Sequence, residues 1–96
     1  MPIIDIEIVA RHGEAVAPTL ANDLADALGS VLGAAPGKVW VRLRTLGPEG
    51  YAENQSGEGR PCPVFVTLTA SAPAQGEHLD QVVRQVTEAV ASLTGR

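Results

Sequence analysis

The feature that most constrains this chain is a proline directly after the initiator methionine, followed at once by an alternating apolar segment. Side chains of a β-strand point alternately to the two faces of the sheet, so a period of two indicates a strand with one buried face. The apolar side chains of that face are Ile4, Ile6 and Ile8. The pattern predicts a first strand that anchors the chain terminus in a sheet.

Pro2 becomes chemically unusual if Met1 is removed. Its nitrogen is then a secondary amine, whereas an internal proline nitrogen is an amide without a usable lone pair. A free α-amino group titrates at about pH 7.7 to 8.0, and burial beside a cation lowers that value because both effects penalise the ammonium form. A base poised near the working pH suits proton transfer at carbon, so Pro2 is a candidate general base. The alternative is a proline that only sets the entry of the strand.

The rest of the sequence predicts two helices and two further strands. The expected elements are strands at 3–9, 38–46 and 64–70 and helices at about 14–32 and 74–94. Pro18 belongs to the first turn of the first helix, and Gly33 and Gly95 end the two helices. A strand, a helix of this length and a second strand predict a right-handed unit with parallel strands. Residues 47–63 form a polar loop whose length points to a functional or a disordered segment.

The chain also repeats itself at an offset of about 62 residues. Ile4 then meets Val66 and Ile6 meets Leu68, and the two predicted helices and their final glycines align as well. We therefore expect a single domain, residues 1–96, built from two related units at about 2–46 and 64–96 that are joined by the polar loop 47–63. Its class is α+β with β-α-β-β-α order, in which two helices pack on one face of a mixed sheet with a pseudo-twofold repeat.

A Met-Pro start, an alternating strand, a helix and a second strand resemble the tautomerase superfamily, which includes 4-oxalocrotonate tautomerase and macrophage migration inhibitory factor. Its longer members resemble two short units fused, with proline only at the start of the first, and here Pro2 aligns with Val64. The resemblance implies a small isomerase that interconverts the keto and enol forms of a 2-oxo or 2-hydroxy acid, with Pro2 as base. It implies no cofactor and no metal, and it implies a homotrimer. The alternative is a non-catalytic ligand-binding or oligomerisation module on the same scaffold.

Three arginines are candidates for binding a substrate carboxylate. Arg42 and Arg44 lie two apart on one face of the second strand, where guanidinium groups could grip a carboxylate and lower the pKa of Pro2. The alternative is that they pair with the acidic residues of the first strand. Arg11 follows the first strand, close to where short members of the family resemble one another in having an arginine, although a solvated charge is as reasonable there.

Two aromatic residues complete the candidate site. Trp40 stands where the family keeps a substrate-binding arginine. Either Arg42 or Arg44 has taken over the charge role, or the substrate differs from the dicarboxylate that the family handles. The indole itself would form a wall of the pocket or fill a subunit interface. Tyr51, in the long loop, could donate a hydrogen bond to a developing enolate oxygen. Its alternative role is to pin the loop onto the domain.

The composition limits which kinds of partner and which compartment are expected for the protein. A net charge of −4 with seven basic residues argues against nucleic acid, which requires a surplus of Lys and Arg on one face. Cys62 is the one cysteine, so no internal disulfide and no cysteine metal cluster are expected. No apolar run approaches the length of a membrane span and no signal segment opens the chain, which makes the cytoplasm the expected compartment. A chain of 96 residues buries little surface by itself, so oligomerisation is expected to cover the second face of the sheet.

Overall fold

A computed structural model describes residues 2–55, 57, 61–71 and 75–96. The elements follow one another as β1 (Ile3–Val9), α1 (Leu20–Val31), β2 (Trp40–Leu46), the short 3₁₀ helix η1 (Pro48–Gly50), β3 (Val64–Thr69) and α2 (Gly76–Thr94). The predicted α+β class and β-α-β-β-α order are confirmed. The expected helix start near 74 falls outside the described residues. Within the described chain, neither helix is long and apolar enough to cross a membrane.

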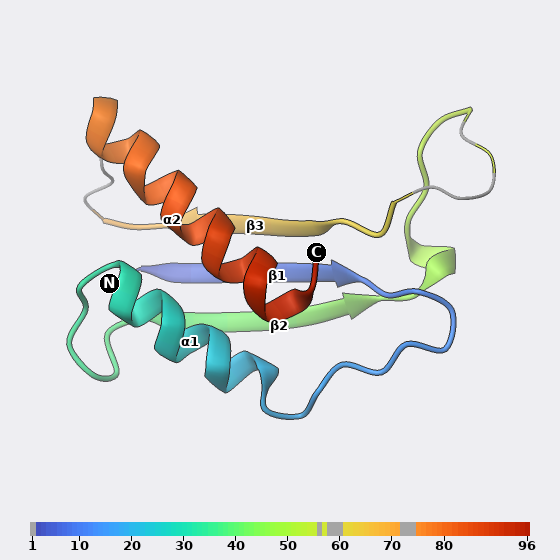
Figure 1. The fold of residues 1–96 in the computed structure, drawn as a ribbon, viewed down its shortest axis with the longest axis horizontal. Helices are drawn as coiled ribbons and strands as arrows, with labels where there is room; N and C mark the ends of the chain where they lie inside the picture. Colours follow the sequence, from blue (N-terminus) through green and yellow to red (C-terminus); the bar gives the residue numbers. More distant parts are fainter. Residues whose placement is uncertain (1, 56, 58–60, 72–74) are drawn as a thin grey trace.

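β1 is the central strand of a three-stranded mixed sheet of order β2-β1-β3. It pairs in parallel with β2, with Ile3 opposite Trp40, and antiparallel with β3, with Ile3 opposite Thr69. Figure 1 shows both helices in front of the same face of the sheet, and α1 and α2 pack against each other. The strand that carries Pro2 therefore has a neighbour on each side and a helical layer over one face.

The core lies between this face and the two helices. Ile4, Ile6 and Ile8 are at most 3% exposed, as the period of two in the sequence predicts. The helices contribute an apolar stripe at helical spacing to the same cluster: Leu20, Leu24 and Leu28 from α1, and Val86 and Val90 from α2. Each fully buried aliphatic side chain contributes about 1.5 to 3 kcal/mol of transfer free energy, so this cluster is what fixes β1 in place.

The first helix begins later than predicted. It starts at Leu20 and not near residue 14, and Pro18 precedes it, so the prediction of Pro18 in the first turn was wrong. The residue before a proline is disfavoured in helical conformation, and the Leu20 amide closes a turn onto the carbonyl of Ala17 at 3.1 Å. Glu14 is also held by a distant contact, because Arg96 at the end of α2 donates to its carboxylate at 2.7 and 3.2 Å.

The two predicted glycine caps are confirmed. Gly33 and Gly95 have φ of 62° and 70°, in the left-handed region that favours glycine. The Gly95 amide donates to the carbonyl of Ala91 at 3.0 Å, which satisfies one of the last carbonyls of α2.

No helix of the described residues covers the second face of the sheet (Figure 1). We call it the bare face, and the pairing register places on it Ile3, Asp5, Glu7, Trp40, Arg42, Arg44 and Phe65. The Trp40 and Phe65 residues are 52% and 46% exposed. A face with two exposed aromatic side chains among charged ones is a reasonable surface for a partner subunit, as the sequence led us to expect.

Candidate functional site

Pro2 lies at the entry of the central strand. Its carbonyl accepts a hydrogen bond of 3.1 Å from the Trp40 amide, and the residue is half-buried. The next residue, Ile3, is paired on both sides, so Pro2 cannot fray away from the sheet without breaking the ladder. The predicted anchoring of the terminus is therefore observed. Met1 itself lies outside the described residues.

Trp40 is the predicted site residue that the sheet brings next to Pro2. It opens β2 directly beside the start of β1, and its indole Nε1 donates to the carbonyl of Gly37 at 3.2 Å. That hydrogen bond fixes the ring at the strand entry although the residue is half exposed. Trp40 thus lies beside the entry of β1, on the bare face with Ile3.

Arg42 and Arg44 lie farther along β2 and are paired within the chain. Arg42 donates to both carboxylate oxygens of Asp5, at 2.7 and 3.0 Å, and this hydrogen bonding lowers the pKa of Asp5 and raises that of Arg42. Arg44 approaches Glu7 at 3.8 Å. Pairing with the acidic residues of β1, one of the two alternatives left by the sequence, is thus what the single chain shows. Both guanidinium side chains remain about two-thirds exposed on the bare face.

Arg11 lies at the other end of β1 from Pro2. The seven residues of β1 lie between the two and alone span roughly 23 Å, at about 3.3 Å per residue. The Arg11 amide donates to Glu14 at 2.9 Å, and its guanidinium lies 3.6 Å from the same carboxylate. Pro2 and Arg11 therefore cannot contact one small substrate within a single chain.

Tyr51 also belongs to the far end of the sheet. It follows η1, and its hydroxyl donates to the Glu53 carboxylate at 2.6 Å. Its ring lies 5.9 Å from that of Phe65, which stands opposite Glu7 on the bare face. These contacts are those of a residue that pins the loop onto the domain, the alternative role left open for Tyr51. The chain thus places Pro2 and Trp40 at one end of the sheet and Arg11 and Tyr51 at the other.

Arg96 holds several segments together although the sequence pattern does not single it out. Its side chain is only 11% exposed and donates to the carbonyls of Cys62 and Val9 at 2.7 and 3.0 Å as well as to Glu14. The guanidinium of Arg96 is the main reason that the pKa of Glu14 is lowered to about 2. Nothing in the local sequence could have revealed this role, because the partners lie 34 to 87 residues away.

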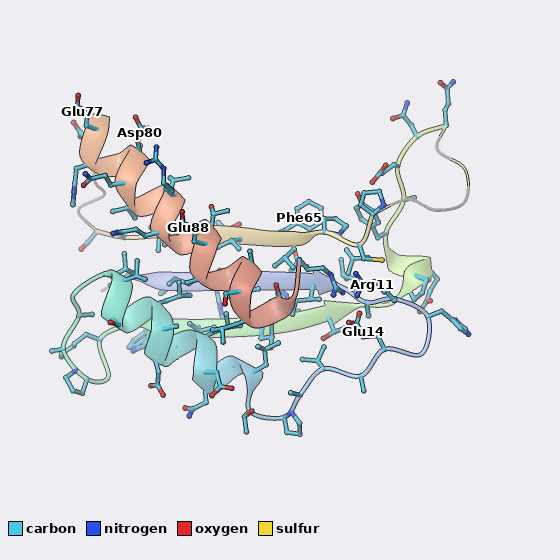
Figure 2. The ribbon with its side chains drawn as sticks, in the orientation of Figure 1. Arg11, Glu14, Phe65, Glu77, Asp80 and Glu88 are labelled. Carbon is cyan, nitrogen blue, oxygen red and sulfur yellow. The ribbon has the colours of Figure 1, made fainter. Side chains whose placement is uncertain are left out.

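Arg96 also lines a groove of about 590 Å³ between β3 and the C-terminal half of α2. We call it the β3–α2 groove; its walls include Arg11, Cys62, Val64, Val66 and Val90. It lies at the end of the sheet away from Pro2, as the positions of Arg11 and the start of β3 in Figure 2 make visible. Among the described residues, no three His, Cys, Asp or Glu side chains gather where they could hold a metal ion.

Comparison with known proteins supports the fold by structure alone. No family model and no curated protein matches the sequence. The chain is similar to the crystal structure of Pt0534 inactivated by 2-oxo-3-pentynoate, with a TM-score of 0.72 and 16% identity, covering 98% of this chain and 75% of that one. It is also similar to native Ps01740, with a TM-score of 0.60 and 15% identity, covering 98% and 82%. Together with the element order and the mixed sheet, this likeness shows that the chain shares the fold of these two proteins.

Proposed function

We propose that this protein is a cytoplasmic tautomerase that moves a proton between carbon and oxygen of a 2-oxo or 2-hydroxy carboxylic acid, with the amine of Pro2 as general base. The observation that carries the proposal is the placement of Pro2 at the entry of a central, doubly paired strand. It is supported by the shared fold with Pt0534, a protein inactivated by 2-oxo-3-pentynoate. That compound is a 2-oxo acid with a conjugated alkyne, which an amine or a thiol can attack.

The chemistry requires removal of Met1, because the Pro2 nitrogen is otherwise an amide. The free amine takes the hydroxyl proton of the enol, and the resulting ammonium returns a proton to carbon 3 of the enolate. One proton is taken and one is given back, so the step needs no oxidant, reductant or organic cofactor. An apolar neighbour such as Trp40 and the cations of β2 would favour the neutral amine, which is the form that acts as a base.

The arginines supply the carboxylate-binding charge in this proposal. Arg42 is the closest of the three along the sheet, since it stands opposite Asp5, which is three residues or roughly 10 Å from Pro2 along β1. A substrate carboxylate would exchange with, or share, the guanidinium that Asp5 now holds. Arg44 extends the same positive row toward the middle of the bare face.

Arg11 and Tyr51 enter the proposal through a second copy of the chain. Because one chain separates them from Pro2 by the length of β1, they can complete its site only from a neighbouring protomer. A homotrimer that covers the bare face and its exposed aromatic residues would bring the Pro2 end of one sheet next to the Arg11 and Tyr51 end of another. Tyr51 would then polarise the substrate carbonyl.

The test compares protein with a free Pro2 amine to protein that keeps a Gly-Ser extension ahead of Pro2. The extension turns the amine into an amide and changes no side chain. With an enol such as phenylenolpyruvate, the proposal expects the extended protein to lose about 10²-fold or more in rate while its circular dichroism stays the same. Intact mass must first show that Met1 is removed in the native protein. Equal rates for the two forms would eliminate Pro2 as the base.

A second candidate function, a non-catalytic oligomerisation module, is favoured by one observation. Asp5 accepts two hydrogen bonds from Arg42, the arginine closest to Pro2 along the sheet, so this guanidinium already has a structural partner in the single chain. Exchange of Asp5 for Asn separates the two functions. A tautomerase should bind substrate more tightly, with a lower KM, once Arg42 is released, whereas a module should show no turnover in either form.

A further inference from the structure

β3 is an edge strand with one side free of partners among the described residues. The sheet has the order β2-β1-β3, so only the side of β3 that faces β1 is paired. Proteins protect such edges with charged residues, proline or bulges, because unpaired backbone groups recruit other strands. The segment Val64–Thr69 reads VFVTLT and contains neither a charge nor a proline. Within the described part of the chain, the edge is therefore open to another strand.

The pairing with β1 determines which backbone groups of β3 point outward. The Val9 amide donates to the Pro63 carbonyl at 3.0 Å, so these two opposed residues are a hydrogen-bonded pair. Such pairs alternate along an antiparallel ladder, which directs the backbone of Phe65, Thr67 and Thr69 toward β1. The amides and carbonyls that face outward belong to Val64, Val66 and Leu68.

The same three residues place their side chains on the helix-covered face, yet the helices do not cover them. Val66 and Leu68 stand opposite Ile6 and Ile4, which are fully buried, but each is itself 37% exposed. Figure 1 shows the reason: α2 crosses β3 obliquely and its first turns extend past the free edge. In those turns, Leu79 and Val83 are 40% and 55% exposed. The helix therefore overhangs the place where a further strand would lie.

We propose that this edge binds β3 of a second copy of the chain, antiparallel about a twofold axis at Val66. In that register Val66 faces Val66 of the other copy and Val64 faces its Leu68. The outward groups then form roughly six hydrogen bonds in the spacing of an ordinary antiparallel ladder. The result is one continuous sheet across two chains, with all four helices on the same face.

The β3–α2 groove gives this pairing its apolar contacts. The Leu68 side chain of each copy comes to lie beside Val64 of the other, where the groove of about 590 Å³ is walled by Val66 and Val90. The overhanging turns of α2 cover the incoming strand in return. Exposed apolar surface on β3 and α2 is thereby buried reciprocally, as a twofold interface requires.

Charge also favours a second copy. α2 starts with Glu77 and Asp80, which Figure 2 shows at its overhanging end, and this end follows closely on Leu68 along the chain. The twofold axis carries that acidic end to the Val64 end of the other copy, where Arg11 lines the groove with its side chain 60% exposed. Opposite charges therefore meet at both ends of the interface, and the two α2 helices run antiparallel with favourably opposed dipoles.

The test is disulfide crosslinking in a Cys62→Ser background, which removes the natural thiol. Val66→Cys places two cysteines opposite each other on the axis, with Cα atoms about 5.5 Å apart, within the range that a disulfide spans. Leu68→Cys is the matched control, because four residues of offset along the strands place its two copies more than about 13 Å apart. Both substitutions retain a small apolar side chain on the same strand and face.

Under mild oxidation, the Val66→Cys protein should form a covalent dimer at least about tenfold faster than the Leu68→Cys protein. Folding of each variant is checked by circular dichroism before oxidation. Equal rates, a faster Leu68→Cys protein, or no dimer from either variant overturns the proposal. The readout uses no activity, so its failure is independent of the role of Pro2.

Discussion

Replacing Leu24 by alanine tests whether the cluster beneath the helices holds β1 in place. Leu24 is fully buried and belongs to the same cluster as Ile4 and Ile6. The change removes roughly three methylene-sized groups at about 0.8 kcal/mol each, and incomplete collapse around the cavity adds about 1 to 2 kcal/mol. We expect the free energy of unfolding to fall by about 3 to 4 kcal/mol. That is a large part of the 5 to 15 kcal/mol that is typical of a domain.

The assay is urea unfolding followed by circular dichroism at one fixed protein concentration, because the proposed assembly would make stability concentration-dependent. The midpoint should fall and the slope should stay the same. Leu93→Ala is the matched control: the same atoms are removed from a residue that is 39% exposed, and about 1 to 2 kcal/mol should be lost. A loss below about 1 kcal/mol for Leu24→Ala, or a larger loss for the control, would refute this account of the core.

Two further predictions concern single contacts. Because Arg96 lowers the pKa of Glu14 from 4.5 to about 2, this pair stabilises the fold fully above pH 4.5, and its contribution is lost as the pH falls toward 2. The difference in urea midpoint between wild type and Glu14→Gln should shrink over that window, and a constant difference argues against the pair. Gly95→Ala should lower the free energy of unfolding by about 1 kcal/mol since φ is 70° there, whereas Gly29→Ala inside α1, with open space around it, should raise it by about 0.4 to 1 kcal/mol. Melting temperatures that shift in the same direction contradict the conformational argument.

The strand pattern and the glycine caps could be predicted because they depend on neighbouring residues. The alternation around Ile4, Ile6 and Ile8 specifies which face of β1 is buried, and any register that buries this face gives the same core. The start of α1 could not be predicted as well. Apolar spacing extended it to residue 14, but Glu14 is held by Arg96, a contact across 82 residues that no local pattern encodes.

The candidate site likewise contains residues whose positions could be predicted from the sequence and residues whose positions could not. The position of Pro2 follows from its place at the start of a strand, and the structure confirms that it is anchored. The choice between ligand binding and pairing for Arg42 depended on the register between β1 and β2, which places it opposite Asp5. Alternation indicates the face of each residue but not the register. The separation of Arg11 from Pro2 follows only from the direction and length of the strand.

The most direct test of the central claim is to find which atom 2-oxo-3-pentynoate modifies in protein whose Met1 has been removed. The amine of Pro2 and the thiol of Cys62 in the β3–α2 groove are the two nucleophiles to distinguish first. Tandem mass spectrometry of the treated protein should locate one adduct on the N-terminal peptide, at the Pro2 nitrogen, with parallel loss of tautomerase activity. An adduct on Cys62 alone, or an unmodified Pro2 after prolonged treatment, would contradict the proposal that Pro2 is the reactive base.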